Sequence, residues 1–121
     1  MLLDSNILIY AVQPAYAHLL EFMQANPVKV SALSKIEVLG FPGLNEAERQ
    51  CFEGFFRDFD VCPVSDAVVD EAVRLRQKCK MTLGDSIIAA TALCHGLKLV
   101  TRNVKDFDKI ARLAVLNPVD R

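Results

Sequence analysis

Four acidic residues along this chain have the types and positions that metal-dependent chemistry requires. Asp4 ends an apolar run at the start of the sequence, and Asp85 begins an apolar segment. Glu37 and Asp106 each follow a segment that is predicted to be a strand. Carboxylates that gather at one place repel one another and raise each other's pKa, so a cluster of them needs a cation. Oxygen-only ligands suit Mg²⁺ or Mn²⁺, and such a site can activate water and hold a scissile phosphate.

Each acid also has a structural explanation of its own. Asp4 is placed to cap a helix that follows the first strand. Glu37 and Asp85 each stand three residues after a Ser or Thr, which is the spacing of a capping box. Asp106 is placed to cap a last helical turn at 107–112. The Ser and Thr of the two boxes are Ser34 and Thr82.

Short apolar strands alternate with amphipathic helices along the sequence. This alternation is typical of an α/β domain with a mainly parallel sheet and helices on both faces. Because parallel strands end at the same edge of a sheet, the four acids are expected to meet there. The predicted strands are 1–4, 28–30, 59–64, 97–101 and 114–116. Helix boundaries are predicted at Ser31 or Ser34, at Asn45 with Glu48, at Ser65, and at Asn26, Pro27 and Gly96.

Length and composition narrow the class of protein. The 121 residues indicate one domain, 1–121, and the 52% hydrophobic content is enough for a core. The formal net charge of −1 lacks the basic excess of many nucleic-acid-binding proteins, so RNA binding would require a metal or a local basic patch. The four cysteines have no zinc-site spacing and indicate thiols in a reducing cytoplasm. No apolar run reaches the roughly 18 residues of a membrane span, and no signal peptide is expected.

Four motifs follow one another across essentially the whole chain. They are LLDSNILIY from residue 2, SALSKIEVL from residue 31, LGDSIIAATA from residue 83 and LVTRNVKDF from residue 99. The last two are the most specific, because D-x-x-I-A-A-x-A followed closely by T-x-N-x-x-D-F is uncommon by chance. Through these motifs the chain resembles PIN-domain ribonucleases, of the kind found as VapC-type toxins in prokaryotic toxin–antitoxin pairs. The resemblance implies a PIN-like three-layer α/β/α domain with a mainly parallel central sheet.

The resemblance also assigns roles to individual residues. It implies that the catalytic acids are Asp4, Glu37, Asp85 and Asp106. Of these, Asp4, Asp85 and Asp106 are expected to bind the metal directly. The polar residues expected to orient the carboxylates or water are Ser5, Asn6, Thr101 and Asn103. Ordinary turn chemistry explains Thr101 and Asn103 equally well, and Asp108 is an alternative to Asp106, which the family pattern favours.

The function implied by the resemblance is a Mg²⁺- or Mn²⁺-dependent endoribonuclease. It implies an RNA substrate, an antitoxin protein as partner and a homodimer. Two alternatives remain open: a non-catalytic PIN-fold module that binds a protein, and another Mg²⁺-dependent phosphotransfer enzyme. A phosphoaspartate hydrolase usually has a second Asp two residues after the first, where this chain has Asn6. The basic residues near the acids that could contact RNA phosphates are Lys78, Lys80, Arg102 and Lys105, although lone charges are more often simply solvated.

Overall fold

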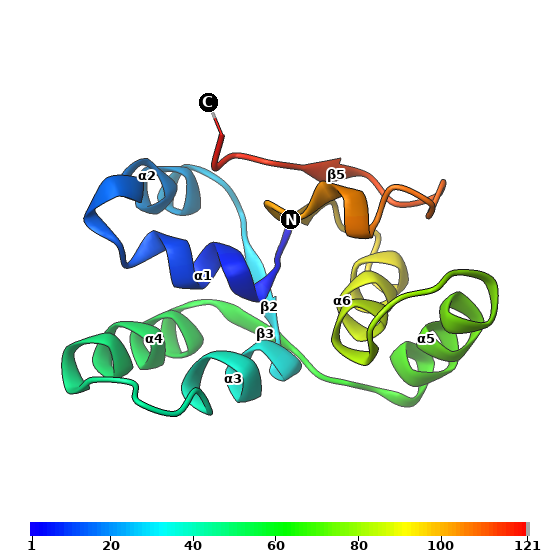
Figure 1. The fold of residues 1–121 in the computed structure, drawn as a ribbon, viewed down its shortest axis with the longest axis horizontal. Helices are drawn as coiled ribbons and strands as arrows, with labels where there is room; N and C mark the ends of the chain where they lie inside the picture. Colours follow the sequence, from blue (N-terminus) through cyan, green and yellow to red (C-terminus); the bar gives the residue numbers. More distant parts are fainter. Residues whose placement is uncertain (121) are drawn as a thin grey trace.

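The centre of the molecule is a sheet of five strands, all paired in parallel (Figure 1). The computed structural model describes residues 1–120. The strand order is β3-β2-β1-β4-β5, so the first strand of the chain lies in the middle. The strands are β1 Leu2–Leu3, β2 Lys29–Ser31, β3 Asp60–Cys62, β4 Leu99–Val100 and β5 Val115–Leu116. Each overlaps a predicted strand, and the mainly parallel sheet is confirmed.

Helices cover both faces of this sheet and complete the predicted α/β/α layers. Helices α1 to α4 lie on one side, and α5 and α6 lie on the other (Figure 1). The helices are α1 Ser5–Ala11, α2 His18–Ala25, α3 Ala32–Leu39, α4 Glu46–Asp58, α5 Asp66–Lys78 and α6 Leu83–Cys94, with the 3-10 turns η1 Pro14–Tyr16 and η2 Val104–Asp106. Within residues 1–120, no helix has both the length and the apolar character needed to cross a membrane.

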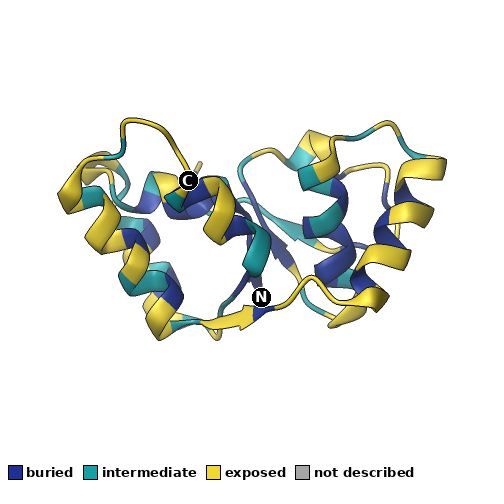
Figure 2. Ribbon diagram, turned by 90° about the horizontal axis from the view of Figure 1, so that it is seen from below, coloured by how far each residue is buried: buried dark blue, intermediate teal, exposed yellow. Residues whose placement is uncertain are grey.

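The alternation of side chains along each strand divides the interior into two cores. Successive strand residues point to opposite faces of a sheet. Leu2 and Leu99 therefore pack under α5 and α6, whereas Leu3 and Val100 pack under the helices of the other face. The inward faces of the helices are largely buried and their outward faces are largely exposed (Figure 2). The two cores hold the short central strands rigidly, so the residues that follow these strands have defined positions.

Most predicted helix boundaries are confirmed in detail. Asn45 and Glu48 form a reciprocal capping box at the start of α4. The Ser65 hydroxyl accepts a hydrogen bond from the Val68 backbone N–H at the start of α5. Gly96 follows the end of α6 with a φ of 62°, a left-handed conformation that glycine adopts without strain.

The predicted capping box at the start of α3 is wrong. Ser31 is the residue that caps this helix, because its hydroxyl accepts a hydrogen bond from the Leu33 backbone N–H. Ser34 and Glu37 consequently lie within the helix, one turn apart on the same side. Both side chains are thereby free for contacts outside their own helix.

The predicted helical turn at 107–112 is also wrong. Asp106 ends the 3-10 turn η2, and the following residues form turns. Phe107, Ile110 and Leu113 are buried in the core under α5 and α6 and anchor this segment. Side-chain burial, and not a helical hydrogen-bond ladder, therefore positions the residues around Asp106.

Candidate active site

The carboxyl ends of β1 and β4 lie at the point where the strand order reverses: β2 and β3 follow on one side of β1, and β4 and β5 lie on the other. β1 and β4 are neighbours, and the chain leaves them toward opposite faces of the sheet. In open α/β sheets, ligands bind in the crevice at such a switch point. Asp4 directly follows β1 and Thr101 directly follows β4, and the Asp4 backbone N–H donates to the Val100 carbonyl oxygen at 2.9 Å. The two strands thus place a carboxylate and a hydroxyl side by side.

Asp4 is the most deeply buried of the four acids, with 7% of its surface exposed. Its Oδ2 accepts a hydrogen bond from Thr101 Oγ1 at 2.8 Å, and its Oδ1 accepts one from the Ser5 backbone N–H at 2.8 Å. Burial raises the pKa of Asp4 from 3.8 to about 6, although these two hydrogen bonds oppose the rise. The charges of Asp85 and Glu37 raise the pKa of Asp4 further. Asp4 therefore caps α1, as predicted, and also faces other acids.

Asp85 enters the site from the first turn of α6. Thr82 caps this helix by accepting a hydrogen bond from the Asp85 backbone N–H at 3.1 Å. Burial raises the pKa of the Asp85 carboxyl, and the charges of Asp106 and Glu37 raise it further. The predicted capping of α6 by the Thr82 hydroxyl is thus confirmed. The Asp85 carboxylate, however, lies beside other acids.

Glu37 reaches the site from α3. Ser5 Oγ donates a hydrogen bond to Glu37 Oε1 at 2.8 Å and is also hydrogen-bonded to Ser34 Oγ at 2.8 Å. The start of α6 approaches closely, because a Cβ atom at Gly84 would lie 3.4 Å from Glu37 Oε2. The sequence pattern predicts only a capping role for Ser34. Its spacing of three from Glu37, which is one helix face, is the signal that could have placed it here.

Two amides complete the polar surroundings of the Asp4 carboxylate. Asn6 Nδ2 lies 3.4 Å from Asp4 Oδ2 and 3.3 Å from Thr101 Oγ1. The Asn103 backbone N–H donates to Thr101 Oγ1 at 3.1 Å, and Asn103 itself is exposed. Ser5, Asn6 and Thr101 therefore contact the acids directly, whereas Asn103 contacts only Thr101, through its backbone N–H.

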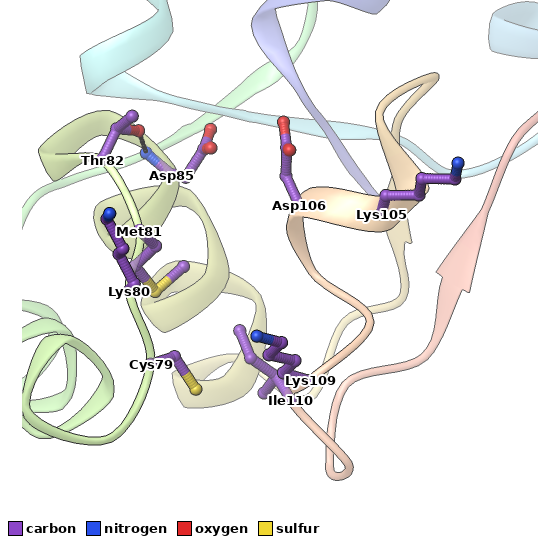
Figure 3. Close-up of a pocket in the computed structure, with 9 residues that line it drawn as sticks. All are labelled: Cys79, Lys80, Met81, Thr82, Asp85, Lys105, Asp106, Lys109 and Ile110. Carbon is purple, nitrogen blue, oxygen red and sulfur yellow. Dashed lines mark hydrogen bonds between the residues drawn. The ribbon is translucent and has the colours of Figure 1, made fainter.

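Asp85 and Asp106 lie side by side at one end of a cleft of about 490 Å³ (Figure 3). Asp106 is exposed and reaches the cleft from η2. Asp108 is also exposed but, unlike Asp106, is not among the residues that line the cleft. The lining residues are Cys79, Lys80, Met81, Thr82, Asp85, Lys105, Asp106, Lys109 and Ile110.

Comparison of the sequence with models of protein families shows which family has this fold and these motifs. The model of the PIN domain family matches residues 1–113. The chain belongs to the PIN domain family. The resemblance read from the four sequence motifs is therefore confirmed.

Relatives and solved structures agree with this membership. Ribonuclease VapC10 from Mycobacterium tuberculosis is 29% identical to this PIN domain over 121 residues, which cover 93% of this chain and 90% of that protein. A toxin–antitoxin complex from Klebsiella pneumoniae contains a chain that is 30% identical, with a TM-score of 0.78 over 97% of this chain and 96% of that chain. A DNA-bound VapBC from Salmonella typhimurium shares the fold at 21% identity, with a TM-score of 0.80 over 95% of both chains.

Of the four acids of this PIN domain, Asp85 and Asp106 line the cleft, whereas Asp4 and Glu37 lie outside its lining. Within residues 1–120, no group of three or more His, Cys, Asp or Glu side chains is arranged to hold a metal ion alone. In the same residues, neither Asp4 nor Asp85 forms an ion pair. Mg²⁺ is typically bound through one or two carboxylates, with waters and substrate phosphates as its other ligands. The oxygen donors of this site fit an ion bound in that way.

Lys109 and Ile110 also line the cleft, although no pattern in the sequence predicts them there. They stand three and four residues after Asp106, a spacing that would share a face with it in a helix. This segment forms turns and not a helix, so no periodic pattern connects the three residues. Their positions depend on the burial of Phe107 and Ile110 in the core.

Proposed function

We propose that this PIN domain is a metal-dependent endoribonuclease that hydrolyses RNA phosphodiester bonds and is the toxin of a toxin–antitoxin pair. The observation that carries the proposal is the position of Asp4 and Asp85 at the switch point of the sheet. Both carboxylates are desolvated and lie near other acids, without an ion-pair partner within residues 1–120. The likeness to Ribonuclease VapC10 supports RNA as the substrate.

In this proposal, Asp4, Asp85 and Asp106 bind Mg²⁺ or Mn²⁺, and Glu37 completes the catalytic acids. When bound, such an ion supplies activation of water and stabilisation of charge at the scissile phosphate. Ser5 and Thr101 hold the two oxygens of the Asp4 carboxylate, so its orientation is set before any ligand arrives.

Glu37 has a separate proposed role. Ser5 holds its Oε1, which leaves Oε2 near Gly84 at the mouth of the site. A carboxylate held at one oxygen can accept a hydrogen bond from water at the other and so orient it for attack. Asn103 is exposed beside the acids and is proposed to orient the phosphate or water.

Cleavage of single-stranded RNA tests the proposed activity. We expect purified protein to cleave a mixed-sequence RNA with Mg²⁺ or Mn²⁺, and EDTA to abolish cleavage. Asp4→Asn should also abolish cleavage, whereas Asp108→Asn, a matched change outside the cleft, should leave it intact. Equal cleavage in EDTA, or an active Asp4→Asn variant prepared in the same way, would contradict the proposal.

We also propose that the protein acts in the cytoplasm as a homodimer that an antitoxin neutralises. The 30% identity to a chain of the Klebsiella pneumoniae toxin–antitoxin complex supports the antitoxin partner. Ile36 and Leu83 are 71% and 62% exposed on α3 and α6, and an assembly that covered them would bury apolar surface. Light scattering of the purified protein, and co-purification with the small protein encoded by an adjacent gene, are the measurements that check this. A monomer at micromolar concentration would contradict the homodimer.

A further inference from the structure

The cleft that holds Asp85 and Asp106 continues into a second cavity along the end of α5. This second cavity has a volume of about 320 Å³ and shares Cys79, Lys109 and Ile110 with the cleft. The two cavities therefore form one groove, which begins at the acids and ends beside Lys78 and Arg112. We call it the basic groove.

Lysine charges along the basic groove are not compensated by acids. Lys78, Lys80, Lys105 and Lys109 are four of the seven lysines in the chain, and all four are exposed. In the part of the chain that the structure describes, none of them forms an ion pair. Arg112 differs, because the Glu71 carboxylate binds its guanidinium group. Although the net charge of the chain is −1, positive charges are therefore concentrated along this groove, directly beside the acids.

Two of these lysines stand on opposite walls of the groove. Lys80 comes from the loop between α5 and α6, and Lys109 comes from the turns after η2 (Figure 3). The amine of Lys105 points away from the carboxylates in the same view. Between the walls the lining is apolar, with Met81 and Ile110. Cationic side chains on both walls of a groove suit single-stranded nucleic acid, because they pair with its phosphates.

We propose that the basic groove binds the RNA strand on one side of the cleaved phosphate, with Lys80 and Lys109 as its principal phosphate-binding residues. The proposal rests on the ribonuclease function proposed above. Because the acids stand at one end of the groove, the bound strand runs from the scissile phosphate toward Lys78 and Arg112. Both lysines hold the substrate and take no part in the chemical step.

Substitution of the two lysines tests this proposal. For single-stranded nucleic acid, the logarithm of the binding constant falls with the logarithm of the salt concentration, with a slope of about 0.7 for each phosphate contact. Each contact therefore strengthens binding by a factor of about five at 0.1 M salt relative to 1 M salt. Lys80→Gln with Lys109→Gln should therefore weaken RNA binding at 0.1 M salt by about 25-fold and lower the salt slope by about 1.4. The measurement is fluorescence anisotropy of a labelled single-stranded RNA in EDTA, followed by cleavage kinetics with metal.

The kinetics separate substrate binding from a structural role. The double variant should show a raised KM with an unchanged kcat at saturating RNA, whereas a disturbed active site would lower kcat. Lys29→Gln with Lys98→Gln is the matched control, because it also removes two lysine charges, at the start of β2 and just before β4, at the opposite edge of the sheet. It should leave both KM and the salt slope unchanged.

The failures of the two proposals are distinguishable. If the wild-type protein cleaves RNA and the double variant has wild-type KM and salt slope, the basic groove does not bind the substrate. Equal weakening by Lys29→Gln with Lys98→Gln would also overturn the assignment, because binding would then depend on overall charge. Absence of metal-dependent cleavage by the wild-type protein would instead overturn the ribonuclease function and, with it, the role of the groove.

Discussion

The buried carboxyl of Asp4 should make the metal-free protein less stable as the pH rises. Its pKa in the folded protein is raised, chiefly by burial, from 3.8 to about 6. Between these two values the folded state binds more protons than the unfolded state, so stability falls with increasing pH. The full difference of 2.2 units corresponds to about 3 kcal/mol. Of this, about 1.4 kcal/mol should be lost between pH 5 and pH 7.5.

Asp4→Asn is the perturbation that isolates this contribution. The amide of Asn does not ionise in this pH range. The free energy of unfolding of the variant should therefore lack the decrease of about 1.4 kcal/mol that Asp4 causes between pH 5 and pH 7.5. Asp85, whose pKa is also raised, still ionises in the variant, so a smaller pH dependence remains there. Lost hydrogen bonds to Thr101 and Asn6 lower the stability of the variant at every pH, and this offset does not affect the slope.

Urea denaturation in EDTA at several pH values between 5 and 7.5 measures both proteins. Asp70→Asn provides the control, because Asp70 is an exposed carboxylate on α5, distant in the fold from the switch point. It should keep the wild-type pH dependence. If Asp4→Asn also keeps it, the Asp4 carboxyl is not desolvated in the way the structure implies, and its placement as a buried acid at the switch point is refuted.

Three further predictions concern metal binding and the core. Mg²⁺ or Mn²⁺ at about 100 times its Kd should stabilise the fold by roughly 2.7 kcal/mol, seen as a raised Tm; no shift at millimolar metal would contradict a metal site. Asp85→Ala should leave the metal-free protein at least as stable as wild type, because it relieves repulsion, and should remove the shift with metal. If Asp85 serves only to cap α6, that variant would instead lose about 0.5–2 kcal/mol in urea denaturation and keep the metal response. Phe107→Ala should cost about 3–5 kcal/mol in urea denaturation, because Phe107 is 1% exposed in the core; a loss below 1 kcal/mol would contradict that burial.

The sheet and most helices could be predicted because their signals are local. Strands such as 97–101 are apolar runs, and Asn45, Ser65 and Gly96 have the chemistry of helix boundaries, which needs no knowledge of distant residues. The start of α3 has two local signals, because Ser31 and Ser34 have equal capping ability. Ser31 takes the capping role at the end of β2, and the burial of Ser34 against Ser5 decides between them.

The candidate site could be predicted only in part, because its parts belong to different elements. Asp4 and Asp85 stand beside strong element boundaries, and the position of Asp4 at the carboxyl edge of the sheet follows from the parallel topology. Lys109 has no such signal, because its position depends on the packing of Phe107 and Ile110 beneath it. Contacts such as Ser5 with Glu37 join residues 32 positions apart, and no spacing rule predicts them.

The central position of β1 has a consequence for the order in which the protein is made. Asp4 leaves the ribosome first among the acids, but its strand is flanked by β4, and its hydroxyl partner is Thr101. Until residues 99–101 have emerged, β1 is an exposed edge, and a chain arrested before that point carries an edge available to other strands. The cleft also needs Asp106 and Lys109. A nascent chain therefore acquires this site only at the end of synthesis, and truncated products lack it however well α1 to α4 have formed.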